Sequence, residues 1–314
     1  MNDSTAVTYI LLEGHIELEK YRYVYFIISF TVYLLIVCCN AGVIFIVLTD
    51  KKLHEPMYIF ITALLLNSLF GTTVIYPKLL SDLLSERPGI SYEGCLIQAF
   101  CIYTVALTEF TLLSAMAYDR YVSICKPLQY PTLMNMSTVR KLLFICWFVP
   151  FCEIGILVIL TYRLKLCRFK LERIYCSNYA IVKLSCGDTT VNNLYGIFIT
   201  VIAVIPPVIF IIFSYVRILS VCLKNSKEFR RKALQTCFPH LIALIIIFSV
   251  ISCFEVINNR LEKSVPHIAS MMMSMAILVI LPLFNPVIYG LKLQEIKKRI
   301  KTLFLGKKRI SFRL

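Results

Sequence analysis

The chain has 314 residues and a formal net charge of +15, with 59% hydrophobic and only 16% charged residues. Soluble domains carry about 25% charged residues, so this chain has too few charges to cover soluble surfaces. Soluble enzymes, nucleic-acid-binding proteins and disordered proteins are therefore disfavoured classes. In a membrane protein, excess positive charge is typical of cytoplasmic loops that face anionic lipid, so we expect membrane lipid as a partner and no nucleic acid.

Long uncharged or nearly uncharged segments separate the charged ones. A helix crosses the hydrocarbon layer in about 20 residues, and each segment is long enough. A membrane barrel would instead show short alternating segments. We predict an all-α membrane protein, a seven-transmembrane helix bundle, with spans at residues 23–49, 56–77, 94–118, 142–162, 189–216, 233–257 and 268–291.

The basic residues predict the orientation of the spans. The loops after the first, third and fifth spans and the tail hold 21 of the 33 Lys and Arg residues, when Arg120 is included. The positive-inside rule places the N-terminus outside, although the outer loop 163–188 disagrees with six basic residues. We expect an extracellular segment at 1–22, a transmembrane domain at 23–291, and a cytoplasmic tail at 292–314 that begins with a short amphipathic eighth helix.

The predicted outer side carries two candidate covalent features. Asn2 begins an Asn-Asp-Ser sequon and is a candidate glycosylation site. Disulfides form in the oxidising outer environment, and four cysteines allow three connectivities, which spacing alone does not distinguish. Among these we expect Cys95 to pair with Cys176, with Cys167 and Cys186 as the second pair.

The third span ends in MAYDRYVSICKPL, residues 116–128. This segment resembles the MAYDRYVAIC-x-PL signature of vertebrate olfactory receptors, a branch of the rhodopsin-like G-protein-coupled receptors. The resemblance covers essentially the whole chain. Further matches in the same order are Asn40, LHEPMY at 53–58, SY at 214–215, KALQTCFPHL at 232–241 and NPVIYGL at 285–291.

The chain also departs from the family's pattern. Ser68, beside Asn67, stands where the family usually has an Asp in the second span. Pro239 replaces the usual Ser, and Phe248-Ser249 replaces a common Tyr-Gly pair. These departures, with Glu55 in the first inner loop, resemble the fish branch of the family.

The resemblance implies a switch that couples to a G protein. In the family's pattern Asp119 holds Arg120, which swings free in the active state and packs under the G protein. The alternative is an ion pair that only extends to the membrane interface, with tyrosines that only pack. The residues assigned to coupling and switching are Asp119, Arg120, Tyr121, Tyr215, His240, Asn285, Pro286 and Tyr289.

Intramembrane polar residues are candidate functional groups because they are costly to bury in lipid. Glu109 lies three helical turns before Arg120, on the same helix face. It is either part of a polar cluster that binds water or sodium, or a protonated, hydrogen-bonded side chain. We predict a polar core of Asn40, Asn67, Ser68 and Glu109, near Asn285, and no other metal site.

A ligand pocket is expected in the outer half of the bundle, because small-molecule sites occur between helices. An acid such as Glu255 would favour a cationic or hydrogen-donating ligand, whereas the basic outer loop around Arg168, Lys170 and Arg173 would gather anions. Helical spacing predicts ligand contacts from Tyr103, Ala106, Leu107, Phe110, Thr200, Ala203, Phe248, Ile251, Ser252, Glu255, Met275 and Leu278.

The function that these residues favour is an odorant receptor of the plasma membrane. Its partners would be a small-molecule odorant and a heterotrimeric G protein, of the stimulatory olfactory type by resemblance, with no cofactor and no enzymatic activity. The alternatives are a non-olfactory rhodopsin-like receptor for another small ligand, or a seven-span transporter or channel. An intramembrane enzyme is disfavoured because Glu109, Glu153 and His240 form no recognisable catalytic pattern.

Overall fold

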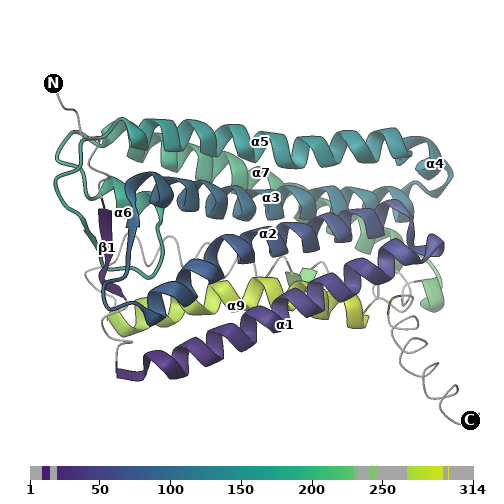
Figure 1. Cartoon of the computed structure of the whole chain (residues 1–314). Coiled ribbons are helices and arrows are strands. Elements are labelled where there is room, and N and C mark those ends of the chain that lie inside the picture. The colour runs from purple at the N-terminus through teal and green to yellow at the C-terminus, as the bar shows by residue number, and fades with distance from the viewer. Residues whose placement is uncertain are drawn as a thin grey trace, which may run out of the picture.

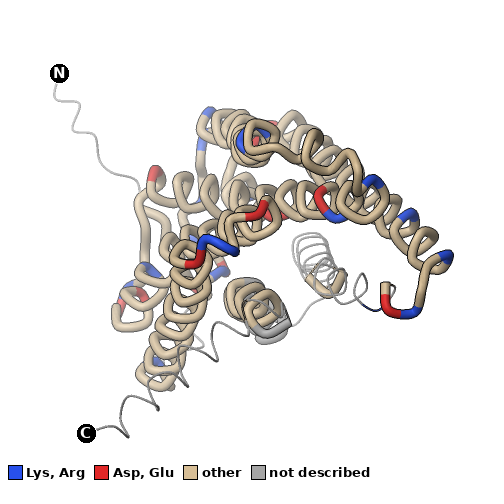
Figure 2. The backbone as a smooth tube through the Cα atoms, turned by 90° about the vertical axis from the view of Figure 1, so that its right-hand side faces the viewer, with Lys and Arg blue, Asp and Glu red and all other residues tan. Residues whose placement is uncertain are grey.

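The computed structural model describes residues 9–14, 20–229, 231, 241–243, 245, 267–292 and 296. These residues form a bundle of long helices that lie side by side (Figure 1), shown along the bundle in Figure 2. Five of them are long and apolar enough to cross a membrane: α1, α2, α3, α5 and α7. The bounds are α1 (Arg22–Thr49), α2 (Pro56–Leu84), α3 (Tyr92–Cys125), α5 (Met136–Tyr162), α7 (Thr190–Leu223) and α9 (His267–Lys292).

The expected all-α membrane fold is confirmed, and the long helices coincide with six of the predicted spans. The remaining span, at 233–257, lies mostly outside the described residues, as does most of the predicted eighth helix. The helices run further than the uncharged segments. For example, α2 continues past Pro77 to Leu84 because Lys78 and Asp82 form an ion pair one helical turn apart.

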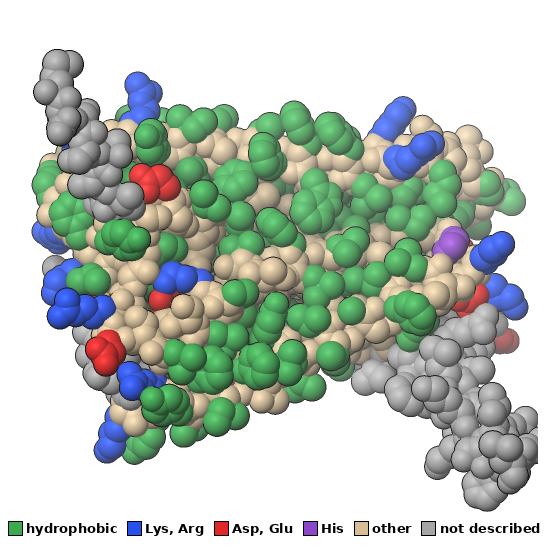
Figure 3. Space-filling model, in the orientation of Figure 1, with side chains coloured by type: hydrophobic (Ala, Val, Ile, Leu, Met, Phe, Trp, Pro, Cys, Tyr) green, Lys and Arg blue, Asp and Glu red, His purple; other side chains and the backbone are tan. Residues whose placement is uncertain are grey.

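The outward surface of the bundle is apolar. Figure 3 shows hydrophobic side chains along its middle, with most charged side chains toward the two ends. Ile27, Phe45, Phe144 and Ile209 are each more than half exposed. Soluble monomers rarely expose apolar patches of this extent, so this surface is one that lipid covers.

A small sheet covers one end of the bundle. Strand β1 (Tyr9–Leu12) pairs antiparallel with β2 (Gly89–Ser91) and parallel with β3 (Lys170–Leu171). Ile10 and Leu12 are buried in a core cluster that also contains Cys95 and Cys176. The polar composition of residues 1–22 gave no indication of this strand, because its two buried side chains are visible only as a short alternation.

Two disulfides lie at this same end. Cys95 pairs with Cys176, with a Cα–Cα distance of 5.3 Å, and Cys167 pairs with Cys186, with a distance of 5.5 Å. The loop between these cysteines includes helix α6 (Asn178–Val182). Asn2 lies outside the described residues. The opposite end carries the short helices η2 (Lys51–Leu53), η3 (Pro127–Gln129) and α4 (Tyr130–Leu133).

Candidate ligand cavity and switch residues

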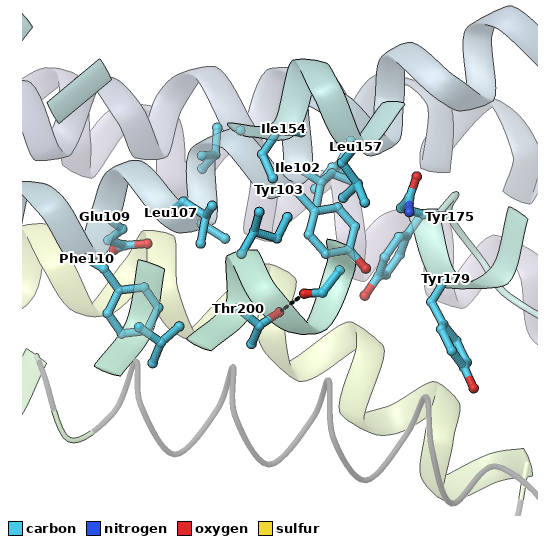
Figure 4. A pocket seen from close by; sticks show the side chains of 18 of the residues that line it. Ile102, Tyr103, Leu107, Glu109, Phe110, Ile154, Leu157, Tyr175, Tyr179 and Thr200 are labelled. Carbon is cyan, nitrogen blue, oxygen red and sulfur yellow. Dashed lines mark hydrogen bonds between the residues drawn. The ribbon is translucent and has the colours of Figure 1, made fainter. Parts of the chain in front are cut away.

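A cavity of about 450 Å³ lies among α2, α3, α5, α7, α9 and the loop that carries α6. Figure 4 shows Glu109 and Phe110 at one end, Tyr103 and Thr200 in the middle, and Tyr175 and Tyr179 at the other end. Most of the wall is apolar. A mostly apolar cavity with a few placed polar groups is the usual form of a small-molecule site.

Part of the predicted ligand wall lines this cavity. The predicted residues that line it are Tyr103, Ala106, Leu107, Phe110, Thr200 and Leu278. Ala203 and Met275 are not among the lining residues: Ala203 packs with Leu107 and Ile199, and Met275 packs beside Ile75 and Tyr76. One helix face serves both the cavity and its neighbouring helices, so spacing alone does not separate the two. Phe248, Ile251, Ser252 and Glu255 lie outside the described residues.

Several lining residues were not predicted from the sequence. The outer loop contributes Tyr175, Asn178, Tyr179 and Val182, directly beside or shortly after Cys176. A disulfide from Cys176 to the start of a helix holds the neighbouring residues over the bundle, so the predicted pairing was itself a signal. Others come from helices that were not considered for the wall: Thr72, Ile75, Tyr76, Ile154, Leu157 and Asn192.

The inner end of the cavity holds a buried polar cluster. Asn285 Nδ2 donates to Glu109 Oε1 at 2.6 Å and lies 3.2 Å from Ser68 Oγ. The three side chains come from α9, α3 and α2, so the cluster joins three helices. Sodium binds oxygen ligands, but here the amide of Asn285 already occupies the acceptor oxygens of Glu109 and Ser68. The carboxyl group is thereby satisfied without an ion.

Asn67, although buried, does not belong to this cluster as we expected. Its Nδ2 donates to the Val105 carbonyl oxygen at 2.9 Å, so it ties α2 to α3 one step away from Glu109. Counting along the helix placed Asn67 next to Ser68, but adjacent helical residues point in directions about 100° apart.

Two prolines in α9 leave carbonyl groups that need partners, because proline has no N–H to donate to the residue one turn earlier. Pro286 frees the carbonyl of Pro282, which accepts from Asn40 Nδ2 at 2.9 Å. Pro282 in turn frees the carbonyl of Leu278, which lies 3.4 Å from the hydroxyl of Tyr76. Side chains of α1 and α2 therefore replace the missing backbone bonds of α9, which assigns a specific structural task to Asn40.

The inner end of α3 carries the predicted ion pair. Arg120 Nε donates to Asp119 Oδ2 at 2.9 Å, and Asp119 is fully buried. Tyr130, which was not predicted, donates its hydroxyl to Asp119 Oδ1 at 2.8 Å from the short helix α4. Burial, together with the charge of Asp119, raises the pKa of the Tyr130 hydroxyl, which therefore stays protonated as a donor. Asp119 is thus held from two sides.

The other predicted switch residues surround this end of the bundle. Tyr121 of α3 is partly buried and faces Phe213 of α7, with ring centroids 6.5 Å apart. Tyr215 and Tyr289 are buried in the same core cluster, on α7 and α9. His240 lies outside the described residues.

Comparison with known proteins identifies the family. The family model described as olfactory receptor matches residues 29–307. Human olfactory receptor 10J1 is 35% identical over 299 residues, which cover 93% of this chain and 91% of that protein. Human olfactory receptor 10R2 is 35% identical over 306 residues (97% and 90%), and human olfactory receptor 6N1 is 32% identical over 302 residues (96% of each).

The apolar helix bundle and these matches define a multi-pass plasma membrane receptor, not an enzyme. The chain belongs to the olfactory receptor family. The resemblance to the fish branch stays a prediction, since the three relatives named above are human proteins.

Proposed function

We propose that this chain is an odorant receptor that binds a small molecule in the cavity and activates a heterotrimeric G protein of the stimulatory olfactory type. The carrying observation is that one helix, α3, lines the cavity with Tyr103 and Glu109 and ends in the Asp119–Arg120 pair. Ligand contacts and switch residues therefore lie on one continuous element. The names of the relatives, all olfactory receptors, support the same function.

The proposed orientation has the end with β1 and both disulfides outside the cell. Disulfides persist in oxidising environments, and both lie at this end. The opposite end carries Lys51, Lys52, Arg140 and Lys141 on or beside its short loops, which agrees with the positive-inside rule. The N-terminus would be extracellular and the tail cytoplasmic.

Glu109 provides the proposed link between ligand and switch. It lines the cavity and is bonded to Asn285, which lies beside Pro286 and four residues before Tyr289 in α9. A ligand that packs against this cluster more favourably in one arrangement of α3 and α9 shifts the population toward that arrangement. Arg120 would then leave Asp119 and contact the G protein.

A ligand-evoked cyclic AMP response in transfected cells tests this function. Arg120→Ala should abolish the response at equal surface expression, because the coupling group is lost. The matched control is Arg140→Ala, an exposed arginine at the same end that contacts only the backbone of its own helix. A ligand-gated current that persists without any G protein would instead support a channel.

A further inference from the structure

The outer part of the cavity contains a second buried polar group, formed by Thr161, Asn178 and Asn192. Thr161 Oγ1 donates to Asn178 Oδ1 at 2.8 Å, and Asn192 Nδ2 lies 3.3 Å from Thr161 Oγ1. The three side chains come from α5, α6 and α7. Thr161 is fully buried, and Asn178 and Asn192 are 6% and 5% exposed. We call these three residues the outer polar triad.

Each asparagine of the triad keeps one polar atom unused by the described part of the chain. Asn178 accepts through Oδ1, so its Nδ2 retains two donor hydrogens. Asn192 donates through Nδ2, so its Oδ1 retains acceptor capacity. Both residues line the cavity. Buried polar atoms without a partner are costly, so a ligand that supplies partners for these two atoms is favoured over one that does not.

Three neighbouring contacts hold the triad rigidly. Tyr92 donates its hydroxyl to the Thr161 carbonyl at 3.1 Å, which ties α3 to α5. Asn178 follows Cys176, whose disulfide joins the loop to Cys95, by two residues. The backbone N–H of Cys176 also donates to Gln98 Oε1 at 2.9 Å. Rigid polar groups discriminate between ligands better than mobile ones, because they do not reorient to suit a mismatched ligand.

The described residues that line the cavity include no Lys, Arg or His, and their one acid, Glu109, is bonded to Asn285 at the opposite end. We infer that the outer polar triad determines ligand specificity by selecting uncharged ligands with an apolar body and a terminal oxygen function. A hydroxyl accepts from Asn178 and donates to Asn192, whereas an aldehyde satisfies Asn178 alone. Alcohols are therefore the best class, aldehydes come second, and primary amines are disfavoured. This inference rests on the proposed function.

The test compares alcohols, aldehydes and primary amines that share one carbon skeleton, across a panel of skeletons, by their half-maximal concentrations in the receptor assay. Asn178→Asp keeps the acceptor for Thr161 but replaces the Nδ2 donor with an acceptor oxygen. The aldehyde response should weaken by about tenfold or more, and the amine response should strengthen, as expected for one lost hydrogen bond to a buried group.

Asn193→Asp is the matched control. It makes the same change one residue after Asn192, on an exposed side chain that donates to Thr189 within its own helix. It should leave the ligand order unchanged. Thr161→Val, nearly the same shape, removes the hydroxyl that orients both asparagines and should reduce the preference for alcohols without reversing it.

The inference is overturned if Asn178→Asp reaches the surface with the wild-type ligand order, or if Asn193→Asp shifts the order equally. It is also overturned if the wild type responds only to permanently charged ligands. These outcomes leave the proposed function intact as long as Arg120→Ala abolishes the responses. If responses survive Arg120→Ala, the proposed function itself is wrong.

Discussion

The two ends of the bundle are held together by different kinds of bond. At the end with the sheet, disulfides join the loop 163–188 to α3 and to itself, and β1 adds backbone hydrogen bonds to both neighbouring loops. At the other end, Asp119 is held by the side chains of Arg120 and Tyr130. The first set of bonds is covalent or repeated along a backbone, whereas the second consists of a few exchangeable side-chain contacts.

This difference indicates where the molecule is built to change. A ligand that enters near the sheet meets a wall with little freedom, so its selectivity is fixed in advance. The side-chain contacts around Asp119 can be exchanged for contacts with a partner at a cost of a few kcal/mol. The fixed end would therefore read the ligand, and the exchangeable end would report it.

The largest expected effect concerns the disulfide of the fixed end. Cys176→Ala should lower the free energy of unfolding by about 2–5 kcal/mol, because the bond closes a long loop and holds Asn178 over the cavity. The measurement is the melting temperature of the detergent-solubilised receptor, with surface expression alongside. Cys152→Ala, which changes a free exposed cysteine, should have little effect. Equal losses in the two variants would contradict the role given to the disulfide.

The second effect concerns the polar cluster between the two ends. Asn285→Leu should cost about 1–3 kcal/mol of stability, because it leaves Glu109 and Ser68 buried without their donor. Glu109→Gln keeps an acceptor oxygen for Asn285 and should cost less. Thermal unfolding of both variants at matched detergent and salt gives the comparison. A larger loss for Glu109→Gln would indicate that the charge of Glu109, and not the hydrogen bond, holds the helices.

The third effect tests the exchangeable end. Tyr130→Phe removes the hydroxyl that donates to Asp119 and should raise ligand-independent signalling by between about twofold and tenfold, since Asp119 then holds Arg120 less firmly. Basal cyclic AMP per surface receptor is the readout. Tyr162→Phe, at the opposite end of α5, is the control. Unchanged or lower basal signalling in Tyr130→Phe would remove Tyr130 from the switch.

The smallest effect concerns pH at the start of α7. Asp188 accepts from the backbone N–H and hydroxyl of Thr190, and these bonds lower the pKa of its carboxyl group. Its stabilising contribution is therefore full above the ordinary aspartate pKa and is lost as the pH falls through the lowered pKa of the folded state. Melting temperatures measured across this acidic range should fall less in Asp188→Ala than in the wild type. Parallel curves for the two proteins would show that the cap contributes nothing.

The sequence predicted the helices well because lipid imposes a strong rule, the long uncharged segment, on each of them. It predicted Asp119, Arg120, Glu109 and Asn285 because charged or amide groups are rare inside spans. It missed β1 and Tyr130, since the strand is only four residues long and a tyrosine after a helix end has no distinctive pattern.

The outer polar triad was not predictable for a different reason. Thr161, Asn178 and Asn192 lie in three separate elements, and each is an ordinary residue at its own position. Only packing brings their polar atoms together. Similarly, the partnership of Asn40 with the Pro282 carbonyl depends on how α1 crosses α9, which helical spacing within one segment does not reveal.

The contrast between the fixed and the exchangeable end is tested most directly by distances between paired spin labels on α5 and α7, with and without a saturating ligand. One pair would sit at Tyr162 and Val191 near the sheet, and the other at Met136 and Leu223 at the opposite end, all exposed positions. The ligand should change the Met136–Leu223 distance distribution and leave the Tyr162–Val191 distribution unchanged. A change confined to the Tyr162–Val191 pair would contradict the assignment of the two ends.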